Sequence, residues 1–211
     1  MVQTCIKTVR ENEHIYRLCT KHKRNKEKGR QLKLKAYIDP LSKVLNRETA
    51  IEKIRERLKT QTMNEECAFI VLDIDNFKNI NDTFGHLYGD AVIAMVAGSI
   101  KSTLDSEDII GRFGGDEFLV YIDNTKPEKL ERKLENIRLA ILKMRIDKND
   151  EKDISCSMGV TLGRGRVKYE DLFRQADSAL YMAKTNGKNR FEYFNGEFID
   201  KNALTYTGIM T

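Results

Sequence analysis

The chain has 211 residues, of which 40% are hydrophobic and 33% are charged, and its formal net charge is +5. This composition indicates a soluble, ordered protein with one full core plus an extension, and no apolar run approaches the ~20 residues of a membrane span. Four scattered cysteines without a CxxC pair favour reduced thiols in a cytoplasmic protein over a zinc site, and the charged N-terminus argues against a secretory signal.

Residues 1–35 form a basic leader with 11 Lys or Arg against three acids, whereas the rest of the chain has 26 basic residues and 29 acids. We interpret the leader as a solvated helix or linker. An arm that binds nucleic acid or a membrane surface is the weaker alternative, because a nucleic-acid-binding protein would carry its basic patch on the folded domain. Six residues have the a/d spacing of a short coiled coil, with a lone helix as the alternative: Val2, Cys5, Val9, Asn12, Tyr16 and Cys19.

A folded domain is predicted over residues 36–195, followed by a tail, 196–211. Pro40 would end a preceding helix, and Asn46 is a plausible cap for the next one. The apolar periodicity predicts a helix over 46–58, a buried strand over 66–75, a helix over 89–104, a hairpin of strands 108–113 and 117–122, a helix over 127–145, a strand over 154–162, a helix over 169–187 and a strand over 190–194. This βαββαβ order is typical of a ferredoxin-like α+β fold, with an antiparallel or mixed sheet and helices on one side.

Two acids end the first predicted strand. Asp73 and Asp75 are two residues apart, so both point to the same side of the sheet. A buried carboxylate is unfavourable unless a cation or hydrogen bonds compensate its charge. Asp73 follows five apolar residues and is the better candidate for binding a cation, whereas we expect Asp75 to cap the helical turn after it.

The stretch GRFGGDEFLV, residues 111–120, places Asp116 and Glu117 at the tip of the predicted hairpin. In the ferredoxin-like order this hairpin is next to the first strand, so both acids are expected beside Asp73. Two or three carboxylates at one sheet edge suit Mg²⁺, whose remaining ligands are water and phosphate oxygens. Gly114 and Gly115 would let backbone N–H groups approach a phosphate.

Three lysines are candidate phosphate-binding cations. Lys78 comes just after the first strand, and Lys184 and Lys188 lie at the end of the last long helix, where cations are favoured. Each of them alone would be interpreted as an exposed charge. Together with the two acid clusters and the Gly-Gly turn, they predict metal-assisted phosphoryl or nucleotidyl transfer.

Residues 36–195 resemble the GGDEF domain family, the diguanylate cyclases. The second matching block fits the family pattern D-x-D-x-F-K-x-x-N-D-x-x-G-H-x-x-G-D at every fixed position, and the third carries the GGDEF signature. Five blocks match in order: DPLSKVLNR (39–47), DIDNFKNINDTFGHLYGD (73–90), RFGGDEF (112–118), SMGV (157–160) and ADSALYMAKTNGKNR (176–190).

The resemblance implies the palm fold of nucleotidyl cyclases and the reaction of two GTP to cyclic di-GMP and two pyrophosphates, with Mg²⁺ (or Mn²⁺) as the metal. It also implies a homodimer in which two GTP-loaded domains face each other. An upstream sensor domain or a regulatory protein would then act through the leader on the dimer geometry. The alternatives are a non-catalytic GGDEF module that binds GTP or a protein partner, and a basic coiled-coil adaptor.

The resemblance also implies roles for individual residues. The metal would be held by Asp73, the Ile74 carbonyl and Asp116, with Glu117 beside them. Asp116 would help to deprotonate the 3′-hydroxyl, and Lys78 would stabilise charge on the phosphates. The nucleotide would be contacted by Asn81, His86, Asp90 and Lys184. For His86, a capping or packing role is an equal alternative. Asp90 could accept hydrogen bonds from guanine N1–H and N2–H₂, which favours guanine over adenine.

Four positions depart from the family pattern. Many relatives carry R-x-x-D before the signature, where product binds and inhibits, but Asp105 stands here in place of the Arg, followed by Asp108. An anion in place of a guanidinium predicts weak or absent product inhibition. Ser42 and Lys43 replace the Thr and Gly of the first motif, and Lys188 replaces an Arg.

Overall fold

The computed structural model describes residues 37–63, 65–123, 126–144 and 153–196. The predicted leader with its coiled-coil spacing lies outside the described residues, as does all of the predicted tail except Gly196. The chain divides into the units Met1–Ile38 and Asp39–Thr211, and the description that follows concerns the second. Within the described residues no helix is both long and apolar enough to cross a bilayer.

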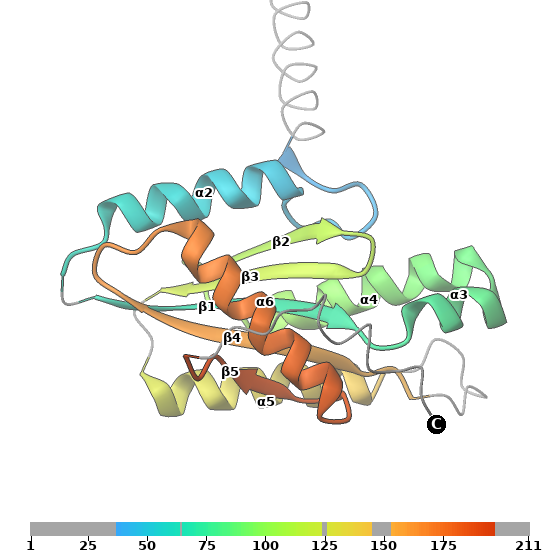
Figure 1. Cartoon of the computed structure of the whole chain (residues 1–211). Coiled ribbons are helices and arrows are strands. Elements are labelled where there is room, and N and C mark those ends of the chain that lie inside the picture. Colours follow the sequence, from blue (N-terminus) through green and yellow to red (C-terminus); the bar gives the residue numbers. More distant parts are fainter. Residues whose placement is uncertain (1–36, 64, 124–125, 145–152, 197–211) are drawn as a thin grey trace, which may run out of the picture. The chain divides into compact units, whose positions relative to one another are not determined.

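The elements occur in the predicted order, with one helix more than the periodicity indicated (Figure 1). They are α2 (Arg47–Thr60), β1 (Glu66–Ile74), α3 (Phe77–Phe84), α4 (His86–Thr103), β2 (Ile109–Gly114), β3 (Glu117–Asp123), α5 (Pro127–Leu142), β4 (Cys156–Arg164), α6 (Tyr169–Thr185) and β5 (Phe191–Tyr193). The extra helix is α3, which Gly85 (φ 84°) separates from α4. The predicted capping residue is confirmed, because Asn46 Oδ1 accepts a hydrogen bond from the Thr49 N–H at 3.0 Å.

The five strands form one sheet in the order β2-β3-β1-β4-β5. The neighbours β2–β3, β3–β1 and β1–β4 are antiparallel, and β4–β5 is parallel. The first four strands therefore have the ferredoxin-like order that the sequence predicted, and β5 extends the sheet at one edge. The central strand is β1, and every residue of it after Glu66 is buried.

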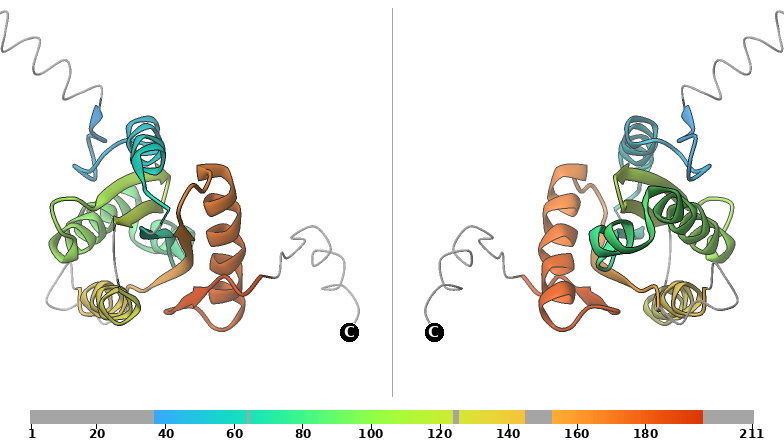
Figure 2. Two further views of the ribbon diagram at one scale, coloured as in Figure 1. Left: turned by 90° about the vertical axis from the view of Figure 1, so that its left-hand side faces the viewer. Right: turned by 90° about the vertical axis from the view of Figure 1, so that its right-hand side faces the viewer.

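Helices cover both faces of the sheet, so the expectation of helices on one side was wrong. Figure 2 shows α4 and α5 on one side of the sheet and α6 on the other. On the first side, Ala68, Ile70 and Leu72 of β1 pack in one core cluster. On the second side, Cys67, Phe69 and Val71 pack with residues of α2 and α6 in another. The apolar run of β1 has no polar alternation, as is typical of a strand buried on both faces.

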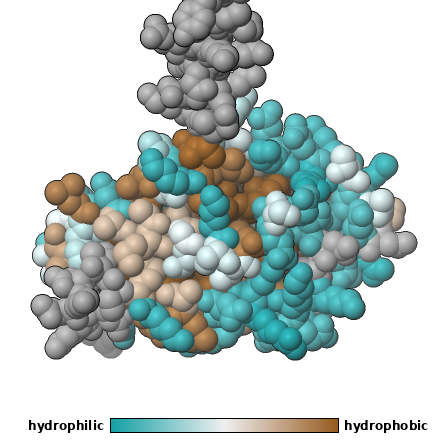
Figure 3. Space-filling view, turned by 180° about the vertical axis from the view of Figure 1, so that it is seen from behind, coloured by the Kyte–Doolittle hydropathy of each residue, from teal (hydrophilic) through white to brown (hydrophobic). Residues whose placement is uncertain are grey.

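The outer surface on the side of α4 and α5 is mixed: apolar residues extend from its upper centre toward the left of the view, and hydrophilic residues dominate the right (Figure 3). Both described cysteines, Cys67 and Cys156, are buried free thiols, and burial raises the pKa of each. They are therefore packing residues, not nucleophiles.

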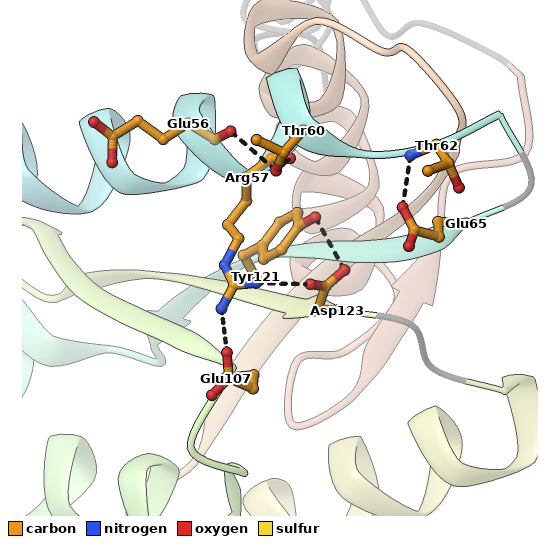
Figure 4. A network of polar contacts seen from close by, with 8 residues as sticks. All are labelled: Glu56, Arg57, Thr60, Thr62, Glu65, Glu107, Tyr121 and Asp123. Atoms are coloured by element: carbon orange, nitrogen blue, oxygen red, sulfur yellow. Dashed lines mark hydrogen bonds and ion pairs between the residues drawn. The ribbon is translucent and has the colours of Figure 1, made fainter.

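Helix α2 is joined to the hairpin by a polar network (Figure 4). Arg57 binds Glu107, which precedes β2, and its Nη1 lies 3.4 Å from Asp123 Oδ2 at the end of β3. Tyr121 OH donates to Asp123 Oδ1 at 3.5 Å. The first helix of the domain and the hairpin that carries the signature are thereby held together by side chains as well as by the core.

Candidate active site

The acids of two motifs meet at one end of the sheet. Asp73 of β1 lies directly opposite Glu117 of β3 in the antiparallel register. This confirms the prediction that the hairpin is next to the first strand. The Ile74 N–H donates to the Asp116 carbonyl at 3.3 Å, which fixes the hairpin tip against the end of β1. The carboxylate of Asp73 and those of the adjacent residues Asp116 and Glu117, more than 40 residues later in the sequence, are therefore brought to the same end of the sheet.

Asp73 has an unusual electrostatic environment. Its side chain is 11% exposed, and its Oδ1 lies 2.8 Å from Nζ of Lys184 in the last turn of α6. Burial raises the pKa of Asp73 to about 6, and the charges of Asp116 and Glu117 add to this rise while Lys184 opposes it. Among the described residues, the site therefore holds more negative charge than Lys184 balances.

Asp75 has a structural role, although not the one expected. Its carboxylate accepts hydrogen bonds from Ser155 Oγ at 2.7 Å, Ser157 Oγ at 2.6 Å and the Asn189 N–H at 3.0 Å. Helix α3 begins instead after Asn76, which makes no side-chain capping bond. Asp75 thus joins the end of β1 to β4 and to the segment after α6, because those donors satisfy a carboxylate that is only 4% exposed.

The signature turn leaves open space at its tip. Gly114 pairs with Glu117, so Gly115 and Asp116 form a two-residue connection. Neither glycine has a positive φ, and a Cβ placed on Gly115 would meet no atom of the other described residues within 4 Å, its chain neighbours aside. The fold therefore does not itself require glycine at 115, and the open surface suits a ligand that approaches the backbone closely.

Arg112 positions this turn, which the sequence reasoning missed. Its Nε and Nη2 donate to the Gly115 carbonyl at 3.0 and 2.7 Å, and its Nη1 lies 3.2 Å from Oδ1 of Asp39. The available signal was a charged residue between apolar neighbours of a predicted strand. Lys43 keeps the turn after Asp39 closed, with its N–H bonded to the Asp39 carbonyl at 3.0 Å, even though its φ of 57° is one that favours glycine.

The expected nucleotide-binding residues lie on α3 and α4. Asn81 Oδ1 is buried without a hydrogen-bond partner among the described residues. It sits so close to α4 that a Cβ at Gly89 would be 1.9 Å from it, so a larger residue at position 89 would displace the Asn81 side chain. His86 and Asp90 are exposed one turn apart on α4, and the packing alternative for His86 is therefore wrong.

Two further lysines lie around α3. Lys78 is exposed in its first turn, and Lys188 Nζ donates to Asn76 Oδ1 at 2.5 Å. The structure therefore gathers Asp73, Asp116, Glu117 and Lys184 at the strand ends. It places the other candidate side chains on α3 and α4, except Lys188, which lies in the loop between α6 and β5.

The segment that departs from R-x-x-D is occupied by ion pairs within the chain. Asp105 Oδ2 lies 3.0 Å from Lys129 Nζ and 2.9 Å from Lys133 Nζ. Lys133 also pairs with Asp108, and those two side chains are 9% and 3% exposed. Both acids are thus neutralised by lysines of α5.

The residues at the strand ends fit a hard divalent cation. They supply carboxylate oxygens and a backbone carbonyl. A cation would compensate the buried charge of Asp73 and relieve its repulsion by Asp116 and Glu117, which together raise the pKa of Asp73. No group of three or more His, Cys, Asp or Glu side chains in the described ranges already converges as a metal cage. Mg²⁺ is compatible with so few protein ligands, because it commonly keeps waters and binds substrate phosphates.

Comparison with known proteins gives one family. The family model described as "Diguanylate cyclase, GGDEF domain" matches residues 36–190. Diguanylate cyclase DgcP of Pseudomonas aeruginosa is 39% identical over 160 residues, which are 75% of this chain and 24% of DgcP. The chain spans between about a quarter and a third of the curated relatives it matches.

Solved structures give the same result. The coiled coil and GGDEF domain of DgcB from Caulobacter crescentus, in complex with c-di-GMP, has a TM-score of 0.75 and 26% identity over 86% of this chain and 98% of that one. Diguanylate cyclase SiaD from P. aeruginosa, in complex with its activator SiaC, has a TM-score of 0.71 and 30% identity over 89% of this chain and 73% of SiaD.

Proposed function

The chain belongs to the GGDEF family of diguanylate cyclases, and from this we propose that it condenses two GTP molecules into cyclic di-GMP with release of two pyrophosphates. In this reaction the 3′-hydroxyl of one GTP attacks the α-phosphate of the other, and pyrophosphate leaves. The same reaction on the second pair of groups closes the ring.

The observation that carries the proposal is the position of Asp73 opposite Glu117, with Asp116 at the adjoining tip and Lys184 on Asp73. A fold needs no such concentration of acids at one sheet edge, and their mutual repulsion is unfavourable for stability. Positions at which charge opposes stability are commonly functional. The open space beside Gly115 adds room for a phosphate.

Asp73, the Ile74 carbonyl and Asp116, with Glu117 beside them, would hold Mg²⁺ or Mn²⁺. The bound metal would neutralise phosphate charge. Asp116 is the group that we assign to accept the proton of the 3′-hydroxyl, since it is partly exposed and follows the exposed Gly115 in the turn, where a second nucleotide could approach. Asp73 is kept in place by its burial and by the pairing of its backbone with β3 and β4.

The remaining candidates would bind the nucleotide. Lys78, Lys184 and Lys188 would bind the phosphates, and the backbone at Gly114 and Gly115 would approach them. The base would lie on the side of α3 and α4, near Asn81, His86 and Asp90. The Asp90 carboxylate would select guanine by accepting hydrogen bonds from the guanine N1–H and N2–H₂ groups.

Catalysis would require two copies of the domain, because each holds one GTP and the two must face each other. We propose that the leader sets the relative placement of the two domains by forming a coiled coil next to the GGDEF domain. A sensor domain or a regulatory protein could act on it, as SiaC is the activator of SiaD. GTP is a cytoplasmic nucleotide, so we place the activity in the cytoplasm.

The test is incubation of the purified chain with GTP and Mg²⁺, followed by chromatographic detection of cyclic di-GMP. We expect product from GTP and little from ATP, and loss of product in Asp116→Ala. Asp171→Ala, which removes an exposed acid of α6 away from the strand ends, is the matched control. GTP binding without product would instead identify a non-catalytic module, and comparable turnover of ATP would refute the role of Asp90.

A further inference from the structure

Lys184 occupies the position of a cation at the candidate metal site. Its ammonium lies 2.8 Å from Asp73 Oδ1, which is itself the most buried of the site's carboxylates. We propose that Lys184 closes the metal site in the nucleotide-free protein, and that metal and nucleotide enter together as Lys184 moves from Asp73 to the phosphates. The inference rests on the proposed function and adds an order of binding to it.

The backbone holds Lys184 at this place. Helix α6 packs directly on β4 at Gly159, where a Cβ would come within 2.0 Å of the Ala176 carbonyl and 2.2 Å of the Leu180 N–H. The helix therefore cannot recede from the sheet without losing that contact. The side chain of Lys184 is flexible and 36% exposed, so it can exchange partners without movement of the helix.

The nucleotide-free site has few ligands available for a metal ion that binds alone. Asp75 is already satisfied by Ser155, Ser157 and Asn189, and the described residues contain no converging group of three metal-ligating side chains. A divalent ion that arrives alone must displace the ammonium from Asp73. An opposite charge at this distance typically stabilises a carboxylate by the equivalent of one to three pKa units. We therefore expect a loss of metal affinity of about tenfold or more.

A nucleotide removes both obstacles at once. Its phosphates supply the oxygen ligands that the protein lacks, and they offer Lys184 a new anionic partner within reach of its side chain. Metal and nucleotide then each raise the affinity for the other, and thermodynamic linkage makes the two effects equal. The protein would bind neither one well alone.

Lys188 provides a matched comparison. Its ammonium donates at 2.5 Å to the neutral side chain of Asn76, which follows Asp73 by three residues, and not to a carboxylate. Removing Lys188 therefore takes away the same charge from the neighbourhood without freeing a candidate metal ligand. Comparison of the two lysines therefore distinguishes direct competition between Lys184 and the metal for Asp73 from general repulsion of the metal by nearby positive charge.

The experiment is a Mn²⁺ titration of the nucleotide-free full chain, followed by electron paramagnetic resonance of the free ion. We expect weak binding in the wild type, about tenfold tighter binding in Lys184→Met, and less than a twofold change in Lys188→Met. Lys184→Arg, which keeps the charge, should remain as weak as the wild type. Circular dichroism spectra and melting temperatures establish that each variant is folded, and if Lys184→Met is not, Lys184→Gln takes its place.

A second titration measures the linkage. Addition of a non-hydrolysable GTP analogue should tighten Mn²⁺ binding by at least tenfold in the wild type and by a smaller factor in Lys184→Met. Two results of the nucleotide-free titration would overturn the proposal. One is an equal Mn²⁺ affinity of wild type and Lys184→Met, and the other is an equal increase in Mn²⁺ affinity over the wild type in Lys184→Met and Lys188→Met. Because the first titration needs neither turnover nor GTP, absence of cyclase activity would refute the proposed function without deciding this inference.

Discussion

Arg112 and Asp39 form an ion pair between positions 73 residues apart, with Nη1 3.2 Å from Oδ1 and both side chains 18% exposed. The same guanidinium binds the Gly115 carbonyl. Burial raises the pKa of Asp39, but hydrogen bonds from Ser42 and Arg112 outweigh that effect and hold the pKa below its ordinary value. One side chain thus connects the start of the domain to the signature turn.

Arg112→Ala should therefore lower both stability and turnover. We expect the free energy of unfolding to fall by about 1–2 kcal/mol, because a partly buried ion pair and two hydrogen bonds are lost. Turnover should fall further, since the turn loses its anchor. Urea unfolding and initial rates measure the two effects. Arg55→Ala, which breaks an exposed pair with Glu170, should change stability by less than about 0.5 kcal/mol because solvent screens that pair.

Asp73→Asn and Asp75→Asn should have opposite effects on stability. At pH 7.5 the first should raise the free energy of unfolding by about 1 kcal/mol, because it removes a buried charge next to other acids. The second should lower it by about 2 kcal/mol, since an amide cannot accept all the bonds from Ser155, Ser157 and Asn189. Chemical denaturation of both variants checks this, and destabilisation by both would contradict the distinction.

The advantage of Asp73→Asn should depend on pH. The folded-state pKa of Asp73, about 6, lies above its ordinary value of 3.8, so the folded protein binds more protons than the unfolded chain between these values. The unfavourable effect of the ionised group is thus complete above pH 6 and disappears as the pH falls toward 3.8. The difference in free energy of unfolding between Asp73→Asn and the wild type should shrink over that range. A difference that stays constant would mean that folding does not raise the pKa of Asp73.

Lys133 and Lys129 should differ strongly although both pair with Asp105. Lys133→Met leaves Asp108, 3% exposed, without its cation, so the free energy of unfolding should fall by about 3 kcal/mol. Lys129 is 64% exposed, and Lys129→Met should cost less than about 0.5 kcal/mol because solvent screens its pair. Thermal unfolding of both variants decides the matter, and similar losses would mean that Asp108 does not depend on Lys133.

Product inhibition at the segment 105–108 should be weak or absent. An anionic product would meet Asp105 in place of a guanidinium, and the nearby lysines are already engaged by Asp105 and Asp108. Initial rates with increasing added cyclic di-GMP should fall only as competition at the GTP site requires. A tight, stoichiometric product complex that Asp105→Ala weakens would contradict this expectation.

Activity per molecule should rise with protein concentration, because a single domain holds only half of the proposed reactive pair. Initial rates over a hundredfold dilution series, with the association state measured by light scattering, check it. Constant specific activity from a protein that stays monomeric would exclude the dimer.

The sequence predicted the strand order and the meeting of Asp73 with the hairpin acids, because apolar periodicity and the βαββαβ order determine which strands are neighbours. It did not predict that helices cover both faces, although the unbroken apolar run of β1 was the available signal. The bonds of Asp75 to Ser155 and Ser157, and of Arg112 to Asp39, depend on side-chain directions across distant segments. Periodicity carries no information on those directions.

The late position in the chain of the groups that compensate Asp73 and Asp75 has a consequence for biosynthesis. A ribosome completes the acidic strand ends of β1 and β3 well before it reaches Ser155, Ser157 and Lys184. Until those residues emerge, Asp73 and Asp75 lack the donors and the cation that compensate them. The nascent chain therefore cannot complete this end of the sheet early, and a product truncated before α6 would keep Asp73 but lose Lys184, the cation that pairs with it.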